Sequence, residues 1–313
     1  MALDKDLIQS LDDLFGVHAG FRPAHAKGIM LSGTFTPSPA AASLTRAPHA
    51  VRASTPVTAR FSNSTGLPDI PDNDAANAGP RGFAVRFHLA EHVHTDIIGH
   101  STDGFPTRTP EEFLEFLRAV KASGPDAPKP TPIEQFLGAH PKALEFVMAP
   151  KPIPTSFARE SFFGVNAFKF TNQDGVSQFG RFRIRPDGGS EYLDAAASAT
   201  KTPNFLFDEL AARVTKSPIK LHVVVQLAAK GDVVDDATIH WPEERVELEF
   251  GTIALTQIVS DSASQQRQII FDPIPRVDGI DSSGDPLLNV RADVYLTSGR
   301  RRRAAAQTTA ASS

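Results

Sequence analysis

The chain has 313 residues, of which 41% are hydrophobic, and its mean hydropathy is -0.19. Such a chain buries a substantial core, and its net charge of -4 and pI of about 6.2 give no general attraction to nucleic acid or to an anionic membrane. Because the chain has no cysteine, disulfides, iron–sulfur clusters, thiolate-ligated haem and thiol nucleophiles are all excluded.

The N-terminal segment MALDKDLIQSLDDLFG has the pattern of a short acidic helix. It lacks the basic start and the apolar centre of a signal peptide. No stretch of the sequence is apolar for long enough to span a bilayer. We therefore expect a cytoplasmic protein without a membrane partner.

Four β segments follow the first helix, and each is rich in branched or aromatic residues. In GFAVRFHL, apolar Phe83, Val85 and Phe87 alternate with other residues, which is typical of a strand with one buried face. The predicted strands are Gly28–Thr36, Pro56–Ser62, Arg81–Leu89 and Val93–Gly99.

The period then changes to that of helices. Thr109 is a predicted N-cap, Pro110 takes the first helical position, and Glu112 completes a capping box. The same signal recurs at Thr131 to Glu134, and a third short helix is predicted at Pro141–Met148.

Strands resume in the second half of the chain. A hairpin turn at Asn172 to Gly175 joins two alternating runs between Phe163 and Pro186. A helix at about Asn204–Val214 precedes two long strands in PIKLHVVVQLAA and RVELEFGTIALTQIV, and a shorter ninth run is predicted near Gln268–Phe271. Hairpin spacing dominates, so we predict an α+β fold: an eight-stranded, mainly antiparallel barrel with helices inserted between its fourth and fifth strands.

The segment NVRADVYLTSGRRRR carries one of only two tyrosines in the chain. At helical spacing, Arg291, Tyr295, Ser298 and Arg302 form one stripe. Neighbouring cations favour the phenolate form of a tyrosine, which is an anionic ligand suited to ferric iron. The alternative is an amphipathic terminal helix with a solvated basic end. We expect the small polar segment 304–313 to be a disordered tail.

Histidines offer two further candidates. His88, His92, His94 and His100 cluster in the sequence and suggest a non-haem metal site of cupin type. Such a site usually needs a glutamate shortly after the second histidine, and none is present, so polar histidines on a strand edge or loop are the alternative. His25 lies where a loop meets a strand, a position at which a lone histidine is usually structural.

Four motifs together change this interpretation. RPAHAKG, ARFSNSTG, PRGFAVRFH and R-x-x-x-Y, which begin at Arg22, Ala59, Pro80 and Arg291, occur in the order found in haem catalases. The sequence resembles that superfamily, and more closely its compact branch, the catalase-related peroxidases. The resemblance implies one haem-binding domain over residues 1–303, a barrel of haem-catalase type and a C-terminal helix that bears the haem ligand.

The resemblance also assigns roles to residues on both sides of the haem. Tyr295 matches the proximal ligand of the iron, and Arg291 matches the arginine that holds that ligand as a phenolate. His25 matches the distal histidine, and Ser62 matches the serine that orients its imidazole. These roles are implied by the family and do not follow from spacing alone.

The remaining matches concern the edge and the distal face of the haem. The residues that match propionate-binding arginines are Arg22, Arg60 and Arg302; those that match apolar residues of the distal cavity are Ile98, Phe105 and Phe113. The chain departs from full-size catalases at His100, where those enzymes carry an asparagine. This difference favours peroxidase chemistry over disproportionation of hydrogen peroxide.

We therefore expect a haem b peroxidase that reduces hydrogen peroxide and organic hydroperoxides with a small external reductant, together with weak catalase activity. Two alternatives stay open. One is rearrangement of fatty-acid hydroperoxides, as in the allene oxide synthase relatives of this superfamily. The other is a haem-binding protein without turnover. Whether the protein forms a homodimer also stays open.

Overall fold

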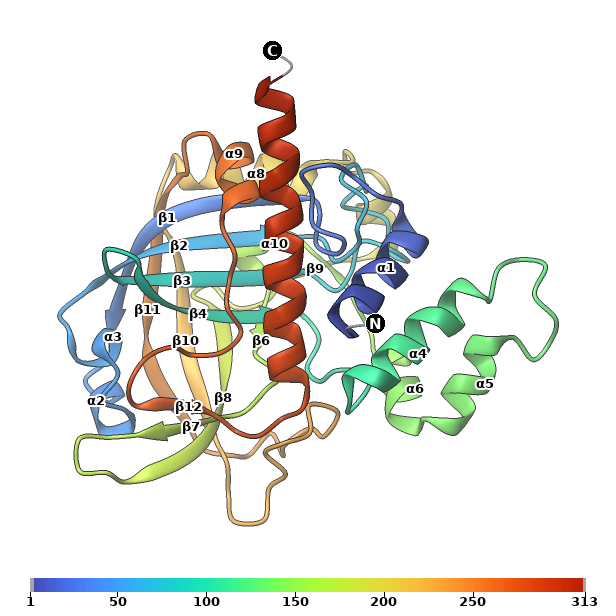
Figure 1. The fold of residues 1–313 in the computed structure, drawn as a ribbon. Coiled ribbons are helices and arrows are strands. Elements are labelled where there is room, and N and C mark those ends of the chain that lie inside the picture. Colours follow the sequence, from blue (N-terminus) through green and yellow to red (C-terminus); the bar gives the residue numbers. More distant parts are fainter. Residues whose placement is uncertain (1–2, 312–313) are drawn as a thin grey trace.

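A closed β-barrel forms the body of the molecule. The computed structural model describes residues 3–311, without the side chains of 306–311. Eight antiparallel strands follow one another round the barrel in the order β10-β11-β1-β2-β3-β4-β6-β8, and pairing of β8 with β10 closes it (Figure 1). Their bounds are β1 Gly28–Pro37, β2 Thr55–Ser62, β3 Gly82–Ala90, β4 Val93–His100, β6 Phe162–Phe163, β8 Ser177–Pro186, β10 Ile219–Leu227 and β11 Glu247–Ile258.

This barrel confirms the predicted fold class, with two differences in the second half. The predicted fifth strand is divided: β6 takes its place in the ring, whereas β7 (Phe168–Thr171) pairs with the far end of β8 and with β12 (Ile280–Ser282). The strand predicted near Gln268–Phe271 is wrong. Its polar start belongs to helix α9 (Ser262–Gln268), and the next two carbonyls accept hydrogen bonds from arginine side chains rather than from a strand.

Aromatic side chains fill the barrel. Phe83, Val85 and Phe87 of β3 are buried while Arg86 and His88 are not, as the alternation predicted. Phe87 packs edge to face on Phe35 at a centroid distance of 5.0 Å. Large apolar side chains at alternate positions of β3 therefore fill part of the barrel interior.

Three helices lie between β4 and β6, as predicted: α4 (Pro110–Lys121), α5 (Pro132–Ala139) and α6 (Pro141–Met148). Both predicted capping boxes are present, at Thr109 with Glu112 and at Thr131 with Glu134. The three helices extend away from the barrel (Figure 1). The smaller elements are α2 Ala41–Leu44, α3 Pro48–Val51, β5 Ile153–Pro154, η1 Phe157–Arg159, β9 Tyr192–Leu193, α7 Ala195–Ala199 and α8 Phe205–Val214.

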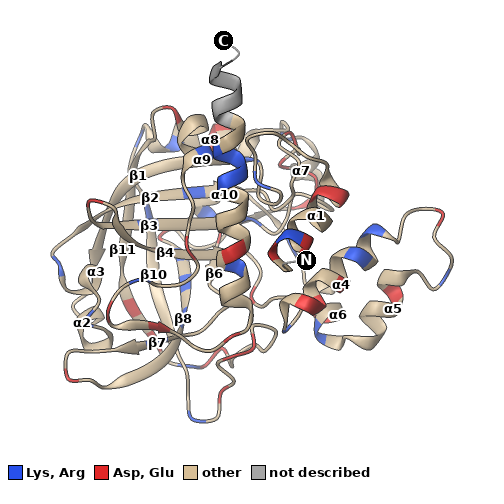
Figure 2. Cartoon of the chain, in the orientation of Figure 1, with Lys and Arg blue, Asp and Glu red and all other residues tan. Residues whose placement is uncertain are grey.

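The long helix α10 (Leu287–Ala311) crosses the barrel wall beside α1 (Leu3–Phe15), as Figure 1 shows. Thr297 Oγ1 donates to Asp4 Oδ2 at 2.8 Å, and the Arg301 guanidinium binds both carboxylate oxygens of Asp12. These contacts join the two ends of the chain. Basic residues gather toward the C-terminal part of α10 (Figure 2).

Helical backbone continues to Ala311, and residues 312–313 lie outside the described residues. Disorder of the segment 304–313 therefore stays a prediction. No helix within residues 3–311 combines the length and the apolar character needed to cross a membrane.

Candidate active site

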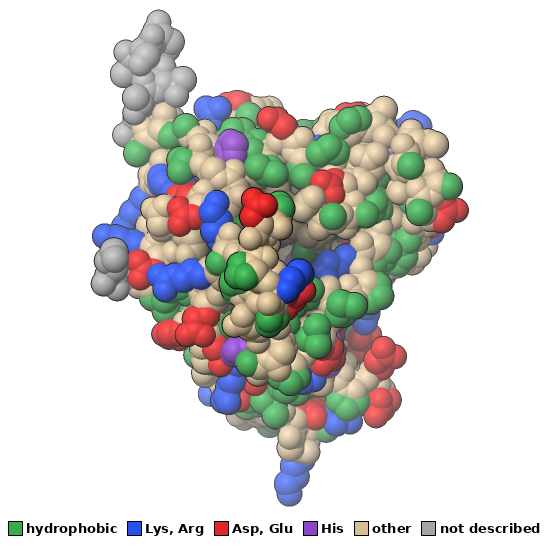
Figure 3. Space-filling view, turned by 90° about the vertical axis from the view of Figure 1, so that its right-hand side faces the viewer, with side chains coloured by type: hydrophobic (Ala, Val, Ile, Leu, Met, Phe, Trp, Pro, Cys, Tyr) green, Lys and Arg blue, Asp and Glu red, His purple; other side chains and the backbone are tan. Residues whose placement is uncertain are grey.

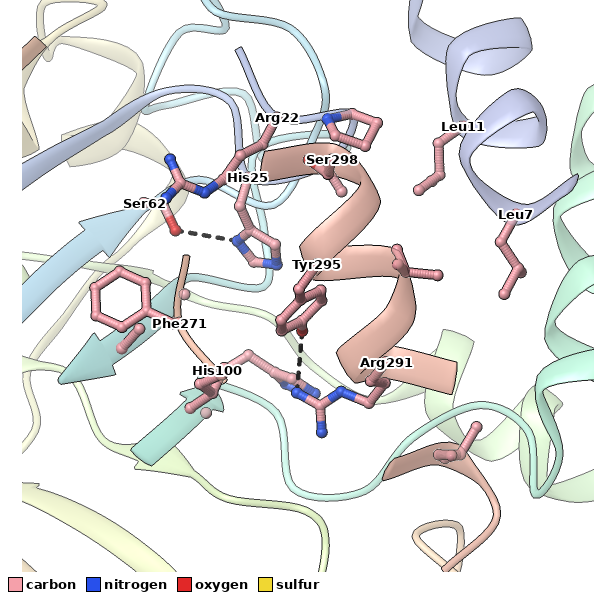
Figure 4. A pocket seen from close by; sticks show the side chains of 18 of the residues that line it. Leu7, Leu11, Arg22, His25, Ser62, His100, Phe271, Arg291, Tyr295 and Ser298 are labelled. Carbon is pink, nitrogen blue, oxygen red and sulfur yellow. Dashed lines mark hydrogen bonds between the residues drawn. The ribbon is translucent and has the colours of Figure 1, made fainter. Parts of the chain in front are cut away.

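A cavity between α10, the ends of β3 and β4, and the loop before β1 brings the predicted site together. The cavity has a volume of about 260 Å³. Figure 3 shows a hollow on one face of the molecule, and Figure 4 shows the side chains inside the cavity. Every predicted site residue lines this cavity: Arg22, His25, Arg60, Ser62, Ile98, Phe105, Phe113, Arg291, Tyr295 and Arg302.

Helix α10 supplies one wall. Arg291, Tyr295, Ser298 and Arg302 all face the cavity, so the stripe predicted at helical spacing exists, and the alternative of a solvated basic end is wrong for Arg302, which is buried. Arg291 Nη2 donates to Tyr295 Oη at 3.1 Å. The phenol oxygen is thus held one helical turn from a guanidinium.

Arg291 is itself held by an amide that the sequence did not single out. Its Nη1 donates to Asn166 Oδ1, and Asn166 Nδ2 donates to Asp285 Oδ2 at 2.7 Å. Asp285 is buried, and burial raises the pKa of its carboxyl. Asn166 therefore separates a carboxylate from the guanidinium, so the positive charge of Arg291 stays available to Tyr295.

His25 lies opposite, in the loop before β1. Its φ of 57° is the left-handed conformation, which is uncommon outside glycine and marks a locally strained backbone. Nδ1 of His25 lies 3.1 Å from Ser62 Oγ at the end of β2. Figure 4 shows the His25 imidazole and the Tyr295 phenol approaching the same space. The two functional groups thus come from opposite ends of the chain.

Electrostatics keep the His25 ring neutral. Burial, followed by the charges of Arg60 and His100, lowers the pKa of His25 to about 3. A neutral imidazole has one nitrogen with a free lone pair. At neutral pH, His25 is therefore able to accept a proton within the cavity.

His100 is the second imidazole of the cavity. Its Nδ1 accepts a hydrogen bond from the Thr102 backbone N–H at 3.3 Å, which leaves Nε2 as the protonated nitrogen of the neutral ring. Burial lowers its pKa to about 4, with the charge of Arg291 as the next cause. His100 is thus a hydrogen-bond donor.

The other histidines of the sequence cluster lie elsewhere. His88 hydrogen-bonds Thr58 on the barrel exterior, and His92 is in the turn between β3 and β4. Within residues 3–311, no three His, Cys, Asp or Glu side chains come close enough to hold a metal ion. The interpretation as a non-haem metal site is therefore wrong.

Three arginines gather at one edge of the cavity. Arg22 and Arg302 each donate to the Ile269 carbonyl, and Arg60 Nε donates to Gln266 Oε1 at 2.8 Å. Burial, followed by mutual repulsion, lowers the pKa of Arg60 to about 9. Among the residues that the structure describes, no Asp or Glu lines the cavity. The cluster therefore carries positive charge without a carboxylate partner.

Apolar side chains form the rest of the wall. Ile98 comes from β4, Phe105 from the next loop, and Phe113 from α4; the rings of the two phenylalanines are 4.9 Å apart. Helix α1 adds Leu7 and Leu11. The cavity is thus apolar over most of its surface and strongly basic at one edge.

The fold places the chain among catalase-fold proteins. A fungal catalase crystal structure superposes with a TM-score of 0.80 at 21% sequence identity, over 95% of this chain and 62% of that one. The catalase family model matches residues 5–309. The chain therefore belongs to the catalase family.

Relatives differ in how much of their length the chain covers. A catalase-related peroxidase of Mycolicibacterium paratuberculosis is 33% identical over 92% of this chain and 90% of its own length, and one of Synechococcus elongatus is 33% identical over 95% and 87%. Catalase A of Emericella nidulans is 31% identical over 88% of this chain but only 39% of its own length. This chain is thus similar in extent to the catalase-related peroxidases.

Proposed function

We propose that the protein is a haem b peroxidase that reduces hydrogen peroxide and organic hydroperoxides with a small external reductant. One observation carries the proposal: a phenol held by a guanidinium faces a neutral histidine held by a serine, across an apolar cavity with a basic edge. The names of two relatives that match over most of both chains support it.

The residues present fit a flat, apolar dianion such as haem. The arginine cluster lacks a carboxylate among the described residues, and the buried Nε of Arg302 has no hydrogen-bond partner there. A buried cation without a counter-ion is unfavourable, so the cluster fits two carboxylates. Arg22, Arg60 and Arg302 would hold the propionates, and Tyr295 Oη would hold the iron.

Bound haem would supply the redox-active iron at which the O–O bond of a peroxide is cleaved. His25 would take the proton from the inner peroxide oxygen at its Nε2 and return it to the outer oxygen, so that water or an alcohol leaves. Ser62 holds Nδ1, which keeps the ring from turning. Propionates beside Arg22 and Arg60 would offset part of the charge that now lowers the pKa of His25.

Two features favour peroxidase chemistry over disproportionation. His100 stands where the resemblance places an asparagine in full-size catalases, and two relatives named catalase-related peroxidase are 33% identical over 92% and 95% of this chain. We therefore expect catalase activity to be the weaker reaction.

Tyr295→Phe tests the ligand. We expect haemin to give the wild-type chain a ferric spectrum typical of phenolate ligation, and the variant to lose that spectrum and most of its haem. Tyr192→Phe, which changes the only other tyrosine, is the matched control for this spectrum. A normal spectrum in Tyr295→Phe would show that the ligand assignment is wrong.

His25→Ala tests the chemistry. This variant is expected to retain haem but to react with peroxide about 10² to 10⁴ times more slowly, because it lacks the positioned base. Peroxide-dependent dye oxidation measures turnover, and product analysis with a fatty-acid hydroperoxide separates reduction from rearrangement. A haem-loaded protein that oxidises no dye and forms no product would instead be a haem-binding protein.

A further inference from the structure

Tyr192 is the second tyrosine of the chain, and the reaction proposed above gives it no role. Its side chain is 43% exposed, yet its hydroxyl donates to Glu160 Oε1 at 2.9 Å. Glu160 is 2% exposed, and the same oxygen accepts the Ser161 backbone N–H at 2.9 Å. The phenol ring thus faces solvent while its proton points at a buried carboxyl.

The segment that carries Tyr192 is held in place. Tyr192 pairs with Pro154 in the β5–β9 ribbon, and Ser190 Oγ lies 2.8 Å from Ser161 Oγ. The Thr155 N–H donates to the Glu191 carbonyl at 2.9 Å. The distance between phenol and carboxyl is therefore set by backbone pairing on both sides.

Burial also makes Glu160 a better proton acceptor than an ordinary carboxylate. It raises the pKa of Glu160 to about 7, and the pKa of Tyr192 is raised as well, by burial first and by Glu160 next. The phenol therefore stays protonated, beside a carboxylate able to take its proton when the ring loses an electron.

A short route joins this pair to the cavity. Phe83 lines the cavity, and its ring stacks on Phe162 at a centroid distance of 5.2 Å. Phe162 follows Glu160 by two residues, and one hydrogen bond completes the path to the Tyr192 hydroxyl. Two stacked rings, a short run of backbone and one hydrogen bond thus connect the cavity to the surface.

We propose that Tyr192 and Glu160 form a surface site at which one-electron reductants too large to enter the cavity are oxidised. The site rests on the proposed peroxidase function. Peroxide accepts two electrons and two protons overall and leaves as water, or as an alcohol and water. Tyr192 supplies one electron along the route described above while its proton moves to Glu160 Oε1, and a reductant then returns the electron as Glu160 returns the proton. Two such cycles supply both electrons, and the two protons that peroxide accepts come from solvent. Exposed Asp194, two residues after the tyrosine, favours a cationic donor, whereas Glu191 pairs with Arg159 at 3.5 Å.

The experiment compares two donors in the haem-loaded protein: ferrocytochrome c, a large cation, and guaiacol, a small phenol. We expect Tyr192→Phe to lose oxidation of ferrocytochrome c and to keep the wild-type rate with guaiacol. Tyr192→Trp restores a redox-active ring and should recover part of the lost rate. Glu160→Gln keeps a hydrogen-bond acceptor without a basic carboxylate, so it should slow the large donor only.

Electron paramagnetic resonance gives a readout that a structural role would not change. Freeze-quenched wild-type protein, mixed with peroxide without a donor, should show a tyrosyl radical that is absent in Tyr192→Phe and replaced by a tryptophanyl radical in Tyr192→Trp. If Tyr192→Phe keeps the radical and both donor rates, the surface site is overturned and the peroxidase function stands. If the wild-type protein oxidises neither donor, the proposed function fails and the inference fails with it.

Discussion

Gly82 leaves room for the contact between the His25 imidazole and the Ser62 hydroxyl. A Cβ atom at this position would lie 2.5 Å from both His25 Nδ1 and Ser62 Oγ, a separation that real contacts do not show. Both groups are attached to paired or strained backbone and have little freedom to move away. The absence of a side chain at position 82 is therefore a requirement of the imidazole–hydroxyl contact.

Gly82→Ala should displace the His25 ring and lower the rate of the reaction with peroxide by on the order of 10²-fold, because a displaced imidazole is no longer positioned to take the peroxide proton. Stopped-flow absorbance of the haem-loaded variant measures this rate. Gly138→Ala is the control, since a Cβ there meets nothing within 4 Å. Equal rates in Gly82→Ala and the wild-type protein would contradict the role given to this contact.

Asn166 acts on the other side of the cavity, through Arg291. Asn166→Leu leaves a partly buried guanidinium donor without its acceptor, which costs on the order of 1 kcal/mol, and frees Arg291 from the position in which it reaches Tyr295. We expect faster haem loss, measured as transfer to an excess of apomyoglobin, and a changed ferric spectrum. An unchanged spectrum and an unchanged rate of haem loss would remove Asn166 from the ligand network.

Capping boxes of the same Thr-x-x-Glu type begin two helices that differ in their contact with the cavity. Thr109 caps α4, which supplies Phe113 to the cavity, whereas Thr131 caps α5, from which no residue lines the cavity. Removal of such a cap costs about 1 kcal/mol in either helix. The two positions thus form a matched pair.

Thr109→Ala and Thr131→Ala should lower the free energy of unfolding by similar amounts, as measured by urea denaturation. Only Thr109→Ala should also speed haem loss, because fraying of α4 loosens a wall of the cavity. Equal effects of both variants on haem loss would mean that α4 does not set the shape of the site.

Several buried ionisable groups of the molecule have shifted pKa values. These shifts have opposite effects on how the free energy of unfolding changes with pH. Burial lowers the pKa of His25 and His49 to about 3 and that of His100 to about 4, against about 6.5 in the unfolded chain. Between these values the unfolded chain binds more protons, so the free energy of unfolding falls as the pH falls below about 6.5. Glu160, with a pKa raised to about 7, keeps its proton longer in the native state and acts in the opposite direction.

Three histidines outweigh one glutamate, so urea unfolding should show a lower midpoint at pH 5 than at pH 7. Each histidine contributes up to about 1.4 kcal/mol per pH unit within its window. Glu160→Gln removes the opposing group and should enlarge the difference between pH 5 and pH 7. A midpoint that does not fall toward pH 5 would mean that the buried rings become protonated without unfolding.

The sequence by itself determined the local features of this protein. Alternation predicted the strands, the capping boxes predicted the starts of α4 and α5, and helical spacing placed Arg291 and Tyr295 on one face. Motif order predicted the family, which the matches to known proteins confirm. The alternation, the capping boxes and the helical stripe are readable because each depends on residues within about one or two turns of the chain.

Only the tertiary structure decided which distant residues meet. Arg22 reaches the Ile269 carbonyl across 247 positions, and Asn166 meets Arg291 across 125, contacts for which the sequence carries no periodic signal. The division of the fifth strand into β6 and β7, and the need for glycine at position 82, likewise follow from closure of the barrel. Closure fixes register and atomic separation through contacts between distant segments, and a local pattern does not encode them.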